Sequence, residues 1–215
     1  MGLPSLLRRR KFYDFELCFE GFADKYIPFD YKAFAKSPVQ TEVVATNCET
    51  GKPVYIKCSA EDKQVIRASR ASASLPFFSK IYDFEGIQCL DGGIAKSIPI
   101  ERAMSYGNDK IIVVLTKEPE YRKAPISSFR RRLISKTYQG YPELIKTMEN
   151  RYYDYNTDIE LVEQLERDGK AFVFRPARRL VSRHESNYDK LRKGYAVGIA
   201  DAEKRFDELR EYLNR

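Results

Sequence analysis

The tripeptide Asp91-Gly92-Gly93 is the part of this chain whose residue types are best suited to acid–base chemistry. It lies in CLDGGIAKSIP (residues 89–99), after an apolar run and ahead of a proline. A glycine pair permits positive φ angles and close approach of other groups, so we expect the Asp91 carboxylate on a sharp turn, where a general base can be held. The alternative for the tripeptide alone is an aspartate that merely caps a turn at the end of a strand.

The elements around this turn predict an α/β protein. The predicted strands are 41–47, 52–57, 80–84, 86–90, 110–117 and 170–177, and the predicted helices are 62–72, 100–107, 125–168 and 188–213. Strand 86–90 ends directly before Asp91. The strand 110–117 is continuously apolar, which is typical of the buried strands of parallel sheets. Residues 1–36 are rich in Phe and Tyr and predict short helices and loops packed through aromatic side chains.

Composition narrows the classes of function. The 215 residues, 43% of them hydrophobic, predict one packed domain, and 38 Lys+Arg against 31 Asp+Glu give a net charge of +7. Basic clusters at 8–11, 130–132 and 175–183 could attract phosphates or simply be solvated. They are far apart and form no recognised nucleic-acid motif, so nucleic acid is not an expected partner. The four cysteines have no C-x-x-C spacing and there is a single histidine, so no metal site and no disulfide framework is predicted, and a cytoplasmic location is expected.

Three stretches together resemble the patatin-like phospholipases. They are VVATNCETGKPVYI (43–56), IRASRASASLPFF (66–78) and LDGGIAKSIP (90–99), in the order and at the separations of that family. The family consists of serine lipid acyl hydrolases that use a dyad of a serine and the aspartate of an Asp-Gly-Gly turn. The resemblance implies that Asp91 is the dyad aspartate, that no organic cofactor is needed and that the substrate is a phospholipid or another acyl lipid. Phe77 and Phe78, which follow Pro76, are candidates for the wall of an acyl pocket, or else core residues.

The chain departs from the family pattern because it contains no G-x-S-x-G nucleophile elbow and no glycine-rich oxyanion loop. Ser72 and Ser74 lack the elbow glycines and are interpreted as helix-end and pocket-wall residues. His184 could serve a Ser-His-Asp triad, but its polar surroundings favour a surface position. Two explanations stay open. Either an N-terminal segment of roughly 70 to 100 residues is missing, or the chain is a noncatalytic lipid-binding or regulatory module.

The sequence therefore predicts a three-layer patatin-like α/β core with a mainly parallel central sheet, incomplete at the N-terminus, and a helical C-terminal portion. Residues 1–124 are expected to be the later part of the hydrolase domain, and residues 125–215 a helical extension with one further strand, packed on the same domain. The parent protein is expected to hydrolyse acyl esters and the chain alone to be inactive. The basic amphipathic stretch 126–138 predicts a peripheral contact with anionic membrane, or else a helix packed on the domain. Oligomeric state is not predicted.

Overall fold

A computed structural model describes residues 14–182 and 185–215 of the chain. Contacts divide these residues into two compact units, each assembled from two separate stretches. Unit 1 comprises the described residues up to Ile98 together with Pro125–Asp154, and unit 2 comprises Pro99–Ala124 and Tyr155–Arg215. No helix within the described ranges is both long and apolar enough to cross a bilayer.

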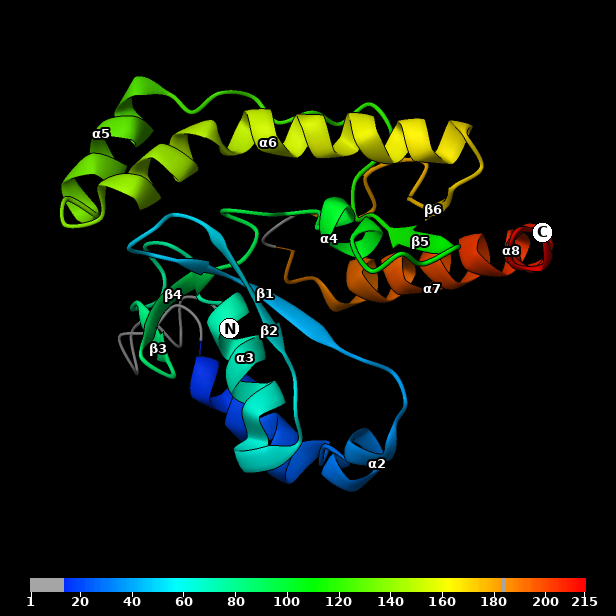
Figure 1. Cartoon of the computed structure of the whole chain (residues 1–215), viewed down its shortest axis with the longest axis horizontal. Coiled ribbons are helices and arrows are strands. Elements are labelled where there is room, and N and C mark those ends of the chain that lie inside the picture. Colours follow the sequence, from blue (N-terminus) through cyan, green and yellow to red (C-terminus); the bar gives the residue numbers. More distant parts are fainter. Residues whose placement is uncertain (1–13, 183–184) are drawn as a thin grey trace. The chain divides into compact units, whose positions relative to one another are not determined.

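Unit 1 contains a four-stranded sheet in the spatial order β2-β1-β4-β3 (Figure 1). The strands are β1 (Glu42–Asn47), β2 (Pro53–Lys57), β3 (Tyr82–Phe84) and β4 (Ile87–Asp91). Every neighbouring pair is antiparallel. The four predicted strands are confirmed, but the prediction of a mainly parallel sheet is wrong for these strands. The physical reason is that β1–β2 and β3–β4 are joined by short turns, whereas a parallel pair needs a long crossover connection.

Helices lie against both faces of this sheet. Helix α3 (Gln64–Ser72) contacts β1, β3 and β4. Helix α5 (Ser128–Thr137) and the first half of α6 (Pro142–Arg167) pack against the opposite face. Neighbouring residues of β4 mark the two faces: Cys89 belongs to the α3 cluster and Leu90 to the α5–α6 cluster, as the alternation of a strand requires. The α3 cluster contains Ala45, Ile56, Ala68, Ala71, Phe84 and Cys89, and the other contains Cys48, Leu90, Ile94, Ile134, Tyr138, Leu144 and Met148.

Residues 14–36 form the short helices that were predicted, while residues 1–13 of that prediction lie outside the described residues. A π-helix, η1 (Leu17–Tyr26), is followed by α2 (Tyr31–Lys36). The ring of Phe29 contacts those of Tyr31 and Phe34, with centroids 4.9 and 5.5 Å apart. An ion pair of 2.7 Å between Arg70 and Glu20 ties η1 to α3.

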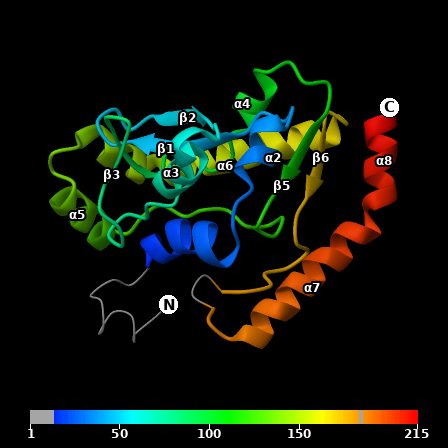
Figure 2. The same ribbon diagram turned by 90° about the horizontal axis from the view of Figure 1, so that it is seen from below.

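Unit 2 is built on one parallel pair of strands, β5 (Ile111–Val114) and β6 (Ala171–Phe174), which lie side by side in Figure 2. The long connection between them permits the parallel arrangement. Burial of β5 was predicted wrongly, since Ile112 is 45% and Val114 is 73% exposed. Alternate residues of a strand face opposite sides, and only the Ile111–Val113 side is covered.

The predicted helices of unit 2 are present with one interruption. Helix α4 (Ile100–Met104) precedes β5, and the closing helix is divided at Arg205 into α7 (Tyr188–Lys204) and α8 (Phe206–Asn214). Helix α7 has no buried residue, so its apolar stripe does not pack as a core element. Helix α8 buries Tyr212, whose hydroxyl donates to the Lys170 carbonyl at 2.9 Å.

Candidate active site

Asp91 is the last residue of β4 and is partly buried. It pairs with Ala45 of β1, and its backbone N–H donates to the carbonyl of Ser74 at 2.8 Å. One carboxylate oxygen, Oδ1, accepts the backbone N–H of Gly93 at 2.8 Å. The carboxylate is thus oriented by the turn that follows it, as a base must be if it is to work on one substrate atom.

The two glycines allow this turn to pack closely against β1. A Cβ atom on Gly92 would lie 1.9 Å from the carbonyl oxygen of Val44, and one on Gly93 would lie 2.9 Å from Oδ1 of Asp91. Neither glycine has the positive φ that the sequence suggested, since the described glycines with positive φ are at other positions. Close approach of the backbone is therefore what requires glycine here.

A buried threonine of β1 holds the turn from within the sheet. Thr46 is fully buried, and its Oγ1 donates to the Asp91 carbonyl at 2.8 Å and accepts the Ala95 N–H at 3.1 Å. These two bonds join both ends of the turn to one side chain. Sequence analysis did not identify Thr46, because a threonine in a β-branched run is indistinguishable from an ordinary strand residue.

An arginine of α6 reaches the same turn. The Nε of Arg151 donates to the Gly93 carbonyl at 2.6 Å, and the hydroxyl of Ser97 donates to the same oxygen at 2.8 Å. Sequence analysis did not identify Arg151 either. A signal was present, since Arg151 lies three residues after Met148 and four before Tyr155, within the apolar stripe of the helix.

The segment after α3 encloses the turn on another side. Ser72 is the last residue of α3, and its carbonyl accepts the Gly92 N–H at 3.3 Å. Ser74 is buried, and its hydroxyl donates to the Arg70 carbonyl at 2.9 Å. Both serines therefore lie beside Asp91 and have structural contacts. His184 lies outside the described residues.

Phe77 and Phe78 lie on the surface of unit 1 and are 45% and 48% exposed. Phe77 has a φ of 69°, its N–H donates to the Tyr138 hydroxyl at 3.1 Å, and the two rings meet edge to face at 5.6 Å. Burial raises the pKa of the Tyr138 hydroxyl. The pair is thus not in the core, and its role as a pocket wall stays a prediction.

The cysteines next to the turn are unsuited to nucleophilic chemistry. Cys48 and Cys89 are fully buried and free. Burial is the main cause that raises the pKa of Cys48 to about 12 and that of Cys89 to about 11. Their thiols are therefore protonated, and unreactive, at neutral pH.

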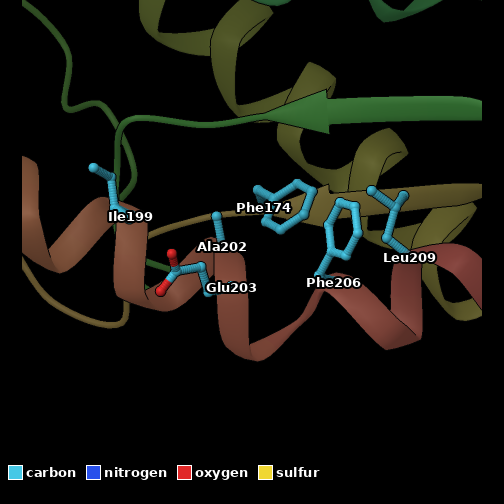
Figure 3. A pocket seen from close by; sticks show the side chains of 6 residues that line it. All are labelled: Phe174, Ile199, Ala202, Glu203, Phe206 and Leu209. Atoms are coloured by element: carbon cyan, nitrogen blue, oxygen red, sulfur yellow. The ribbon is translucent and has the colours of Figure 1, made fainter.

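Unit 2 contains a separate apolar hollow of about 590 Å³. Figure 3 shows its lining side chains, which come from β6, α7 and α8. They are Phe174, Ile199, Ala202, Glu203, Phe206 and Leu209. No residue proposed for catalysis is among them.

Comparisons with known proteins match the two ends of the chain to different families. Residues 4–104 match the patatin-like phospholipase family, and residues 141–214 match a domain of unknown function (DUF6363). An uncharacterized protein of Escherichia coli (strain K12), YjjU, is 26% identical over 140 residues. That match covers 59% of this chain and 39% of the relative, so the chain spans well under half of that protein's length.

The patatin-like match includes all three motifs and the whole Asp91 turn. The two units defined by contacts do not coincide with the predicted domains, residues 1–124 and 125–215. The predicted domain boundary at 124/125 stays a prediction. The resemblance found in the sequence is confirmed, because residues 4–104 of this chain match the patatin-like phospholipase family.

Proposed function

We propose that this chain is the later part of a serine lipid acyl hydrolase that acts through a Ser-Asp dyad, with Asp91 as its base. The observation that carries the proposal is the Asp91 carboxylate, fixed by the Gly93 N–H at 2.8 Å at a strand end within the patatin-like segment. The serine and the oxyanion donors would come from polypeptide that precedes this chain. The isolated chain is therefore expected to be inactive.

Asp91 would move one proton in each half of the reaction. As the serine oxygen bonds to the ester carbonyl carbon, its proton passes to the Asp91 carboxylate, and the carbonyl electron pair moves onto oxygen. The bond to the alcohol then breaks, and the leaving oxygen takes the proton from Asp91. Water attacks the acyl-serine in the same way, which releases the carboxylic acid and restores the serine. The substrate would be a phospholipid or another acyl lipid, with Phe77 and Phe78 beside the acyl chain.

Polypeptide that precedes this chain would also complete the fold. We propose that residues 1–124 belong to a three-layer patatin-like core and that residues 125–215 are its helical extension. Further strands would then add the mainly parallel sheet that the four antiparallel strands of unit 1 do not form. The uncovered side of β5, with Ile112 and Val114 exposed, supports this because apolar strand faces usually pack against another layer.

Contact with a membrane surface is a second part of the proposal. Helix α5 exposes Phe129 to 77% and Leu133 to 43%, next to the basic residues 130–132. Apolar and basic side chains together suit the interface of an anionic bilayer, from which such an enzyme would take its lipid. The enzyme would then be a cytoplasmic protein that binds the membrane peripherally.

The alternative is a noncatalytic lipid-binding or regulatory module of patatin-like fold. The absence of a nucleophile elbow from the sequence favours it, whereas the closely held Asp91 carboxylate favours the enzyme. The two hypotheses differ in what precedes Met1 in the gene. An in-frame segment that encodes G-x-S-x-G favours the enzyme, and its absence favours the module.

The decisive experiment is Asp91→Asn in the full-length protein, assayed with a soluble acyl ester. Asparagine keeps an oxygen that can accept the Gly93 N–H but cannot take a proton, so the fold should persist while turnover falls by about 10²-fold or more. Asp83→Asn, on the neighbouring strand, is the matched control and should retain activity. Near-normal turnover in Asp91→Asn removes Asp91 from the mechanism, and labelling of the 215-residue chain by a fluorophosphonate contradicts its inactivity.

A further inference from the structure

We infer that Arg151 is the positioning residue of the Asp91 turn, holding Gly93 so that the carboxylate is aimed for catalysis. The inference rests on the proposed function and extends it to a residue outside the patatin-like match, which ends at residue 104. It concerns contacts within unit 1 only.

Gly93 is the residue through which Arg151 would act. The Gly93 N–H donates to Asp91 Oδ1 at 2.8 Å, while the Gly93 carbonyl accepts Arg151 Nε at 2.6 Å. A shift of this one residue therefore moves the hydrogen bond that orients the carboxylate. A hydrogen bond from a guanidinium is charge-assisted and stronger than one between neutral groups.

The guanidinium also reaches the space around Gly93 that the carboxylate borders. A Cβ atom built on Gly93 would be 3.4 Å from Nη2 of Arg151 and 2.9 Å from Oδ1 of Asp91, so both groups border the same glycine. Any side chain at position 93 would intrude into this space.

The supporting element makes the contact a rigid one. Arg151 is partly buried on a 26-residue helix whose first half packs into the core through Leu144 and Met148. Arg210, by comparison, pairs at the surface with the exposed carboxylate of Asp207, at 4.0 Å. By contrast, Arg151 binds the main chain of a turn that other parts of unit 1 also hold. The Arg151 side chain and the turn therefore lose little conformational freedom when the substrate reacts.

The test compares Arg151→Ala, Arg151→Lys and Arg167→Ala in the full-length protein, by steady-state hydrolysis of a soluble acyl ester. We expect Arg151→Ala to lower kcat by about 10- to 100-fold with KM changed less than about twofold, since a small misplacement of a catalytic group costs this much. Arg151→Lys, which keeps a charged donor, should recover part of kcat. Arg167 lies on the same helix and bonds to Gln164, so Arg167→Ala should match the wild type.

Rescue separates positioning from general stability. Methylguanidinium added to Arg151→Ala should raise kcat several-fold and leave Arg167→Ala unchanged. If Arg151→Ala does not fold, a reduced kcat at unchanged KM in Arg151→Lys supports the inference, and a wild-type kcat in that variant overturns it.

The outcomes distinguish this inference from the proposed function. Turnover that is lost in Asp91→Asn but normal in Arg151→Ala overturns the role of Arg151 and leaves the function standing. Turnover that persists in Asp91→Asn overturns the function, and the role of Arg151 with it.

Discussion

Two aspartates on neighbouring strands of unit 1 each accept a hydrogen bond from the backbone of a nearby glycine, in different surroundings. Asp83 of β3 accepts the Gly86 N–H at 3.1 Å, and Asp91 of β4 accepts the Gly93 N–H at 2.8 Å. Both residues stand at or near a strand end and precede glycine.

The Asp83 turn is a self-contained hairpin on the surface. Its two central residues, Glu85 and Gly86, have φ angles of 54° and 84°, as a type I′ turn between antiparallel strands requires. A Cβ atom on Gly86 would meet no atom within 4 Å. The ion pair of Glu85 with Arg67, at 3.1 Å, lies at the surface. The hydrogen bond from Gly86 to Asp83 is local, although Phe84 of the same hairpin is buried in the α3 cluster.

The Asp91 turn is instead held by residues from three other segments. Thr46 comes from β1, Ser74 from the segment after α3, and Arg151 from α6. Three distant segments thus hold the main chain of the turn that orients the Asp91 carboxylate, whereas one ion pair, Arg67–Glu85, reaches the Asp83 turn from another element. A group on a turn held in this way is preorganised, which is what the proposed role of Asp91 as a base requires.

The largest effect is expected from removing the close approach at Gly92. Gly92→Ala would place a methyl group 1.9 Å from the Val44 carbonyl oxygen, a backbone atom that cannot move without shifting β1. We expect a loss of about 3 kcal/mol or more in the free energy of unfolding. The measurement is urea unfolding of the 215-residue chain followed by circular dichroism.

Gly86→Ala is the matched variant in the surface turn. The added methyl group would meet no atom within 4 Å, but a φ of 84° is strained for any residue other than glycine. We therefore expect a loss of only about 1 to 2 kcal/mol in the free energy of unfolding. Equal losses for the two variants would show that the turns do not differ in enclosure.

A smaller effect is expected when the bonds of Thr46 are removed. Thr46→Val keeps the shape but deletes the donor to the Asp91 carbonyl and the acceptor of the Ala95 N–H, and leaves that N–H buried without this partner. The expected loss is about 1 to 3 kcal/mol in the free energy of unfolding. Faster hydrogen exchange of the Ala95 amide would locate the change in the turn.

Thr50→Val supplies the control for that variant. Thr50 is exposed, and its hydroxyl accepts the Lys52 N–H at 3.3 Å. Its replacement should change stability by less than about 0.5 kcal/mol. A Thr46→Val protein as stable as Thr50→Val would remove Thr46 from the support of the site.

Local patterns made much of the fold predictable. Strands β1 to β4, helix α3 and the end of β4 at Asp91 followed from β-branched runs and from the Leu75-Pro76 step. The pairing of β1 with β4 did not follow, because the sequence around Asp91 shows no long-range partner. The order of a strand, a glycine turn and a helix along the chain is found in proteins with antiparallel sheets as well as in those with parallel sheets.

The residues of the candidate site likewise fall into those that local sequence predicted and those that it did not. Asp91 and the orienting Gly93 amide were predictable from the tripeptide and its neighbours. Thr46 and Arg151 were not, because they lie 45 and 58 residues from the groups that they bind. Exposure of β5 and α7 was also missed, since an apolar stripe predicts a buried face without stating what covers it.

The smallest effect is expected in the surface turn itself. Asp83→Ala removes the bond to the Gly86 N–H, but that N–H lies in an exposed turn where water can replace the carboxylate. We expect a loss of less than about 1 kcal/mol in the free energy of unfolding, measured in urea with the other variants, because the type I′ geometry of Glu85-Gly86 remains. A loss as large as that of Thr46→Val would mean that a local aspartate–glycine bond stabilises this sheet as much as the long-range contacts do. The two turns would then differ in their position in the sheet, and not in how strongly their contacts stabilise it.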